Sequence, residues 1–314
     1  LIQVTGYCLG TGGAIAAGIL LGKRNKEGAS QLFSLTLLIT VAVGLIIAAA
    51  APFLAMPVAN ALAKGGNLGI LAGHYLFVGM LGAPVIGVGL LMSGFLGVEN
   101  HPELASAYLI VSNVINLILD YILLRFTKLG IAGASLSTVA GFLLGMVIFI
   151  IYIRSPKRMI SLVRIQSLAP LKEAVVSGAP VFVFMVMTIL KSFVLNEIII
   201  RFIGDVGMAV YTVCDNILMI VEMITAGIIG VIPNIAGILY GEKDYFGIRA
   251  LCKRVLVLST AATVCIFVLV MAFAKSITVI FGVDHSELSS MMVTALRIFI
   301  LCLPAYVWNK FLVG

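Results

Sequence analysis

The stretch "NVINLILDYILL", residues 113–124, is apolar enough to belong in a membrane, yet it carries an acid. Eight of its twelve residues are Val, Ile or Leu. On a helix that turns about 100° per residue, Asn113, Asn116 and Asp120 fall within about 60° of one another and form one polar stripe. A carboxylic acid on an apolar helix is costly to keep in a membrane, so the stripe indicates a functional site.

The composition around this stretch is typical of a membrane protein. The chain of 314 residues is 62% hydrophobic and 11% charged, with a mean hydropathy of +1.21, whereas soluble domains are about 25% charged. An all-α integral membrane protein is therefore predicted. Nine runs approach or exceed the roughly 20 apolar residues that cross a bilayer, at about 5–21, 31–54, 73–97, 105–125, 130–152, 173–203, 208–240, 255–275 and 288–311.

The net charge of +7 needs no nucleic-acid partner. Most basic residues lie in the short loops between predicted spans. The loops after the first, fifth and seventh spans hold twelve Lys and Arg residues, and the loops on the opposite side hold five. Because basic loops stay in the cytoplasm, this asymmetry orients a multi-pass protein in a lipid bilayer.

Two distant segments resemble each other. "AGILLGKRNKEGASQL" (17–32) aligns with "AGILYGEKDYFGIRAL" (236–251), with seven of sixteen residues identical. Six predicted spans separate the copies, so both have the same orientation, and the pattern predicts two pseudo-symmetric bundles of a parallel-repeat transporter. We expect bundles at 1–153 and 173–314, joined by a cytoplasmic linker at 154–172. The chain begins at Leu1, almost inside a span, so we also expect missing sequence at both ends.

Asp120 is the leading candidate for chemistry. It lies near the end of its predicted helix, where the helix dipole and burial both disfavour a negative charge, so it is poised to take up a proton or bind a cation. The alternative is an interfacial acid that pairs with Arg125. The next run, "LGIAGASLSTVAG" (129–141), is rich in small residues and suits close helix packing. A hairpin between the two helices would bring Thr138 to the depth of Asn116.

The second half carries its own polar cluster of Lys191, Asp215 and Glu222. The two acids are seven residues apart, which places them on the same face of a helix. Lys191 lies within the sixth predicted span and could neutralise either acid. Buried charges in lipid pair or line a cavity, so a structural ion pair and a substrate path both fit.

The sequence contains no enzyme signature. HExxH, GxGxxG after a strand and the P-loop are absent, as is GxSxG, so we expect neither an enzyme nor a cofactor. The five cysteines show no metal-ligand spacing. We therefore expect no metal site beyond Na⁺ at Asp120.

Together these features resemble the multidrug and toxic compound extrusion (MATE) family of efflux transporters. The resemblance rests on "GILLGKRNKEGA", on "PELASAYLIVSNVINLILDYILL" followed by "LGIAGASLSTVAG", and on the echo "GILYGEKDYFG". It implies that the spans are the second to tenth of twelve, in two six-helix bundles, with the first and last two helices lacking. In one branch of the family, the residues that match Asn116, Asp120 and Thr138 help form a cation site.

The resemblance implies a secondary active antiporter that exports amphipathic organic cations and drugs in exchange for H⁺ or Na⁺ by alternating access. We expect a monomer in a bacterial cytoplasmic membrane, with small organic cations as binding partners. One alternative is a lipid-linked precursor flippase of the same superfamily, for which a strongly basic cavity is expected. A second is a non-transporting membrane module, such as a scaffold or a sensor.

Overall fold

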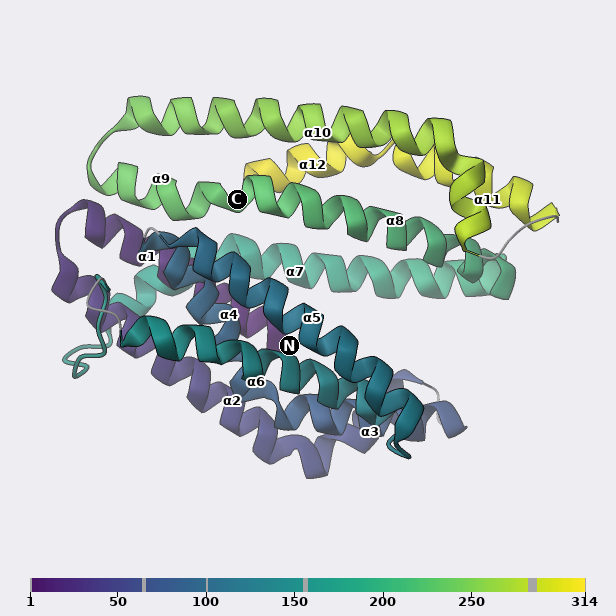
Figure 1. Ribbon diagram of the computed structural model, residues 1–314, viewed down its shortest axis with the longest axis horizontal. Coiled ribbons are helices and arrows are strands. Elements are labelled where there is room, and N and C mark those ends of the chain that lie inside the picture. Colours follow the sequence, from purple (N-terminus) through teal and green to yellow (C-terminus); the bar gives the residue numbers. More distant parts are fainter. Residues whose placement is uncertain (1, 64–65, 100, 155–157, 282–286, 314) are drawn as a thin grey trace. The chain divides into compact units, whose positions relative to one another are not determined.

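The computed structural model describes residues 2–63, 66–99, 101–154, 158–281 and 287–313. Within them all regular secondary structure is helical (Figure 1), which confirms the predicted all-α membrane fold class. The helices are α1 (Ile2–Gly22), α2 (Lys26–Leu62), α3 (Gly66–Leu81), α4 (Ala83–Val98), α5 (Pro102–Phe126), α6 (Ile131–Ile153), α7 (Ala169–Phe202), α8 (Asp205–Ile229), α9 (Val231–Gly241), α10 (Tyr245–Ile280), α11 (Glu287–Ile300) and α12 (Leu303–Val313).

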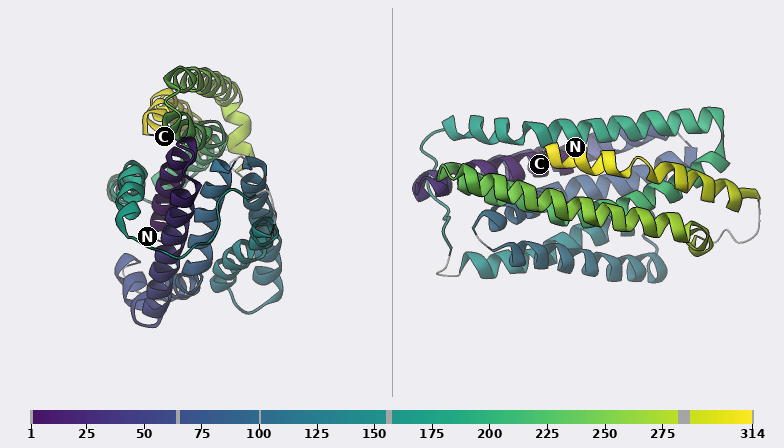
Figure 2. Two further views of the ribbon diagram at one scale, coloured as in Figure 1. Left: turned by 90° about the vertical axis from the view of Figure 1, so that its left-hand side faces the viewer. Right: turned by 90° about the horizontal axis from the view of Figure 1, so that it is seen from above.

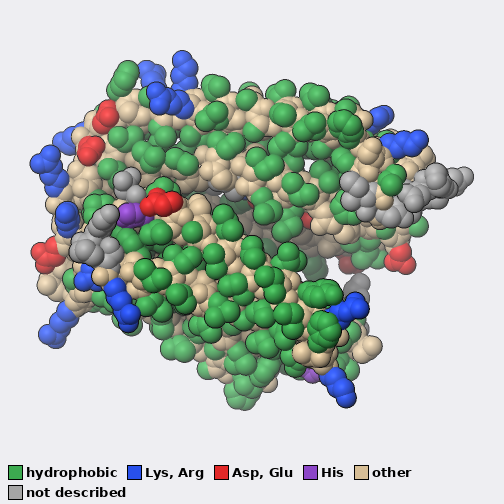
Figure 3. All heavy atoms as spheres, in the orientation of Figure 1, with side chains coloured by type: hydrophobic (Ala, Val, Ile, Leu, Met, Phe, Trp, Pro, Cys, Tyr) green, Lys and Arg blue, Asp and Glu red, His purple; other side chains and the backbone are tan. Residues whose placement is uncertain are grey.

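The helices are long and apolar enough to cross a membrane. Seven spans among the described residues pass by length and hydropathy, the bent pair α3 and α4 makes an eighth, and α1 contributes a shorter apolar helix. Large apolar side chains such as Leu117 and Phe53 are 70% and 76% exposed. On the face seen in Figure 3, hydrophobic side chains cover the middle and Lys and Arg gather toward the helix ends. Such a surface suits lipid rather than water.

Three predicted spans are broken, and each break precedes a proline. The third span begins earlier than expected, at Gly66, and bends by 56° between α3 and α4. Pro84, Pro233 and Pro304 lie in the first turns of α4, α9 and α12. Proline has no amide hydrogen to donate to the preceding turn, so it fits the first turn of a helix and interrupts a longer one. Pro180, in contrast, lies inside the continuous helix α7.

The contacts divide the chain into two compact units. The first comprises Leu1–Phe182 and Asn234–Lys243, and the second comprises Val183–Pro233 and Asp244–Gly314. In the first unit, α1 packs on α2 and α4, and α5 pairs with α6. In the second unit, α10 contacts α8, α11 and α12, and it runs beside α12 in Figure 1 and Figure 2. The expected bundles at 1–153 and 173–314 stay a prediction.

The two copies of the repeat form the same turn. Arg24 and Lys243, which are equivalent in the alignment, have left-handed φ angles of 60° and 63°. The residues that follow, Asn25 and Asp244, each accept a hydrogen bond from the backbone amide three residues later, at 2.9 and 2.8 Å. Each side chain therefore caps the next helix in the same way. The sequence repeat thus corresponds to a repeated local structure.

Part of the expected linker, residues 159–163, lies against the helix ends of the first unit. Residues 155–157 are outside the described residues, and the last four residues of the expected linker are the start of α7. Glu99, which follows α4, is only 6% exposed. Its carboxylate accepts hydrogen bonds from the Tyr152 hydroxyl at 2.5 Å and from the backbone amides of Met159 and Ile160 at 2.8 and 3.3 Å. Charge-assisted bonds of this kind are the stronger hydrogen bonds in proteins.

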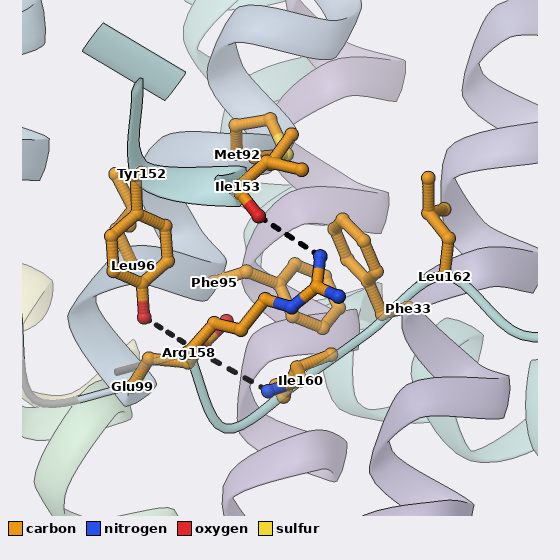
Figure 4. Close-up of a pocket in the computed structure, with 10 residues that line it drawn as sticks. All are labelled: Phe33, Met92, Phe95, Leu96, Glu99, Tyr152, Ile153, Arg158, Ile160 and Leu162. Carbon is orange, nitrogen blue, oxygen red and sulfur yellow. Dashed lines mark hydrogen bonds between the residues drawn. The ribbon is translucent and has the colours of Figure 1, made fainter. Parts of the chain in front are cut away.

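Two serines of α2 hold the next part of the linker. The hydroxyls of Ser30 and Ser34 accept hydrogen bonds from the amides of Ser161 and Val163 at 3.1 and 2.9 Å. Beneath this segment is a small pocket of about 20 Å³ (Figure 4). A pocket of this size holds about one water molecule, so it is no site for an organic substrate.

Replacing Glu99 with Gln should loosen the linker. The amide oxygen of Gln can take the position of Oε2, which accepts all three hydrogen bonds, but these bonds are then no longer assisted by a negative charge. We expect a loss of stability on the order of 1–3 kcal/mol, measured by thermal unfolding in detergent, together with faster protease cleavage within residues 158–168. The control is Glu173→Gln, because Glu173 is exposed and should change stability by less than about 0.5 kcal/mol. Equal stability and cleavage of the two variants would contradict this role.

Candidate functional site

The candidate site lies on the hairpin of α5 and α6, which run side by side in Figure 1. α5 begins with Pro102, has Glu103 in its first turn and Arg125 in its last, the charges that the helix dipole favours at these ends. α6 begins after Gly130, whose φ of 55° suits glycine. The connection is short, so the helices are held as antiparallel neighbours.

Small residues on α6 allow α5 to approach closely. Gly133, Gly141 and Gly145 recur at multiples of four residues and face α5. A Cβ atom on Gly141 would lie 2.5 Å from the backbone oxygen of Ser112 and 3.2 Å from the Cβ of Asn116. Ser137 lies on the same row and is fully buried. The small-residue run therefore acts as a packing surface, as its composition predicts.

The substitution Gly141→Ala should push the two helices apart. The backbone oxygen of Ser112 cannot move away without displacing α5, so we expect a loss of about 1–3 kcal/mol and weaker transport. The matched control is Gly227→Ala on α8, where no atom beyond the adjoining backbone of the helix lies within 4 Å of the new Cβ and alanine should stabilise the helix by roughly 0.5–1 kcal/mol. Thermal unfolding of both variants in detergent tests the contrast. A neutral Gly141→Ala would mean that the hairpin is not tightly packed here.

Four polar side chains meet between the helices. The Asn116 amide donates hydrogen bonds to the hydroxyls of Ser137 and Thr138 at 3.1 and 3.2 Å. The Ser137 hydroxyl donates to the carboxylate of Asp120. Asn116, Asp120 and Thr138 are half-buried, and Ser137 is inaccessible. The structure therefore brings together the three residues proposed from the sequence and adds Ser137 at their centre.

Ser137 was not predicted from the sequence, although the sequence carries a signal for it. Ser137 lies four residues from both Gly133 and Gly141, so it belongs to the small-residue row that faces the neighbouring helix. Thr138, one position later, lies at the edge of this face and still reaches Asn116. Its hydroxyl also donates to the backbone oxygen of Ala134 at 3.0 Å.

Two other residues from the sequence analysis lie outside the cluster. Asn113 donates a hydrogen bond of 2.7 Å to the backbone oxygen of Leu109 on its own helix, so the polar stripe does not act as a unit. Arg125 lies over the ring of Tyr121, 5.9 Å from its centroid. In the described part of the chain no ion pair joins Arg125 to Asp120, and the neighbours of the acid are the neutral groups named above.

In the second unit, a further lysine joins one of the predicted acids. Glu222 forms an ion pair of 2.9 Å with Lys310 of α12, a residue that was not predicted from the sequence. Asp215 lies 3.4 Å from the hydroxyl of Tyr211, one turn away on α8. Among the described residues no ion pair joins Lys191 to either acid.

No group of three or more His, Cys, Asp or Glu residues suited to a metal occurs in the described ranges. The Asp120 cluster instead offers one carboxylate and neutral oxygens. Oxygen ligands of this kind suit hard cations such as Na⁺. A carboxylate with a hydroxyl neighbour also suits a proton.

Comparisons with known proteins agree with this architecture. The chain matches the MatE family model over residues 1–122 and 180–314. It is 26% identical over 241 residues to the multidrug export protein MepA of Staphylococcus aureus (strain MRSA252), which covers 75% of this chain and 53% of that protein. MepA of Staphylococcus haemolyticus (strain JCSC1435) is 25% identical over the same shares. The chain thus spans about half the length of these curated relatives.

Solved structures show the same fold. A crystal structure of MATE in complex with MaD3S aligns with a TM-score of 0.89 at 22% identity, covering 99% of this chain and 70% of that one. A MOP superfamily transporter from Pyrococcus furiosus aligns with a TM-score of 0.87 at 20% identity, covering 98% and 68%. Because the family model matches most of the sequence, this chain belongs to the MatE family.

Proposed function

We propose that the protein is a secondary active antiporter that exports amphipathic organic cations in exchange for H⁺ or Na⁺ by alternating access. The Ser137-centred cluster around Asp120 carries this proposal. Membership of the MatE family and the multidrug export relatives support it. Since those relatives come from bacteria, we place the protein in a bacterial cell membrane.

The cluster has a hydrogen-bonding pattern for both charge states of Asp120. The Ser137 hydroxyl lies within bonding reach of the Asp120 carboxylate and of the backbone oxygen of Ala134, at 2.8 Å from the latter. A hydroxyl has one hydrogen and donates to one acceptor at a time. When Asp120 is ionised, Ser137 donates to it. When Asp120 is protonated, Asp120 donates to Ser137, which turns its hydrogen to Ala134.

Binding of Na⁺ would use the same oxygens. The carboxylate of Asp120 and the hydroxyls of Ser137 and Thr138 supply three, and rotation of the Asn116 amide supplies a fourth. In either case occupancy cancels the charge of Asp120. A bound ion shifts a conformational equilibrium only by its differential affinity for the two states, so exchange requires that one state release the ion more readily than the other.

The proposal is tested with the full-length protein in cells stripped of efflux pumps. Ethidium efflux is followed while an H⁺ gradient or a Na⁺ gradient is imposed alone. We expect efflux to accelerate with one of the two gradients and to stop when that gradient is collapsed. The proposal would be overturned if neither ethidium nor a second cationic dye were exported under either gradient.

Replacing Ser137 with Ala should weaken coupling without unfolding the hairpin. The variant removes the hydroxyl that joins Asp120 to Asn116, so the charged state of Asp120 loses a bond worth about 1.5–3 kcal/mol. We expect the pH or Na⁺ dependence of efflux to shift by about tenfold or more in ion concentration. The matched control is Ser135→Ala, an equally buried serine of α6 outside the cluster. An unchanged ion dependence in Ser137→Ala would remove Ser137 from the site.

A further inference from the structure

The second unit contains an acid that is already neutralised from within the chain. The carboxylate oxygen Oε1 of Glu222 accepts hydrogen bonds from Nζ of Lys310 and from the hydroxyl of Tyr306, both at 2.9 Å. Glu222 belongs to α8, and the two donors lie one turn apart on α12. Donors four residues apart share a helix face, so both reach the same oxygen without distortion.

The pair is partly shielded from the surroundings. The side chain of Lys310 is 18% exposed and that of Glu222 is 40% exposed, and Asp215 lies two turns before Glu222 on α8. Charged side chains within spanning helices persist when they pair. The ammonium group therefore occupies the position that a mobile cation would take beside this carboxylate.

The acids of the two units thus differ in their partners. Asp120 is bonded to a hydroxyl, and the groups around that hydroxyl are neutral. Glu222 is bonded to a tethered cation, and Lys191 adds a further positive charge in its surroundings. A free H⁺ or Na⁺ gains the full attraction of Asp120 but must displace a covalently attached ammonium from Glu222.

We infer that Lys310 is an internal counter-cation that fills the carboxylate site of the second unit. The mobile coupling ion therefore binds at Asp120 and not at Glu222. Removing Lys310 while keeping Glu222 uncovers a second site for H⁺ or Na⁺. This inference rests on the proposed ion coupling, but its central claim concerns cation binding and can be measured without transport.

The experiment counts bound cations on the purified full-length protein in detergent, with ²²Na⁺ in equilibrium dialysis and proton uptake in a pH-stat. The variants are wild type, Lys310→Met, and the double variant Glu222→Gln/Lys310→Met. We expect Lys310→Met to bind one more cation than wild type, as Na⁺ or as a proton, and the double variant to return to the wild-type number. An equal count in folded Lys310→Met and wild type would overturn the inference.

If Lys310→Met does not fold, the double variant still decides the test. It removes both charges of the Glu222–Lys310 pair, so neither remains without a partner. Reconstituted in liposomes, it should export ethidium with the same ratio of ions to dye as wild type. A ratio reduced by one ion would show that Glu222 is itself a coupling acid and would overturn the inference. If no variant transports, the cation count of the double variant decides in the same way.

Asp120→Asn in parallel separates the two proposals. If Asp120→Asn binds one cation fewer than wild type, and the double variant binds the same number as wild type, both the proposed coupling site and the inference on Lys310 are supported. If Asp120→Asn binds as many cations as wild type, the proposed coupling site is contradicted. The cation counts of Lys310→Met and the double variant still test the role of Lys310 in that case.

Discussion

Asp120→Asn in the full-length protein should uncouple ethidium efflux from the ion gradient. The amide resembles the carboxylate in shape and can still bond to Ser137, but it has no charge to gain or lose. With no ion bound differentially in the two states, the gradient cannot bias the transport cycle. Coupling free energies of about 1–3 kcal/mol correspond to 5–150-fold effects. We therefore expect the rate of gradient-driven efflux to decrease by a factor of about 5–150.

Ethidium efflux from pump-deficient cells under an imposed gradient measures this effect. The matched control is Asn113→Ala on the same helix, because Asn113 bonds to its own helix and lies outside the cluster. Surface expression of both variants must equal that of wild type. Efflux of Asp120→Asn at the wild-type rate would make Asp120 a structural residue and move the search for the coupling acid to Asp215.

Lys310→Met should lower the free energy of unfolding more than Glu99→Gln or Gly141→Ala. It leaves the half-buried Glu222 beside Tyr306 without the ammonium of Lys310. Breaking one partner of a buried ion pair costs about 3–5 kcal/mol, whereas replacing both partners with neutral groups is often nearly neutral. Because the side chain of Glu222 is 40% exposed, we expect the loss in free energy of unfolding to lie toward the lower end of that range.

Thermal unfolding in detergent tests the prediction as a double-mutant cycle with Glu222→Gln. We expect the double variant to be more stable than Lys310→Met, because no charge is left unpaired. Lys253→Met serves as the control for loss of a lysine, since Lys253 is exposed on α10 and should change stability by less than about 0.5 kcal/mol. Additive effects of the two substitutions would show that the ion pair does not stabilise the unit.

Much of the fold followed from the sequence because the bilayer imposes it. A spanning segment must bond its own backbone and present apolar side chains, and both requirements can be read from composition and run length. The repeat at 17–32 and 236–251 was also visible, and its equivalent residues Arg24 and Lys243 form the same turn. The breaks were foreseeable only in part, because Pro84 lies in the first turn of a new helix while Pro180 lies within a continuous one.

Within the candidate site, the sequence determined that Asn116 and Asp120 share a helix face, because that depends only on their spacing of four residues. The tertiary structure decided which groups meet them. Ser137, and not Thr138, bonds to Asp120 because the glycine row turns that face of α6 toward α5. Lys310, 88 residues along the chain, and not Lys191, pairs with Glu222. Spacing fixes neighbours on one helix, whereas partners on different helices depend on how each helix is rotated and packed.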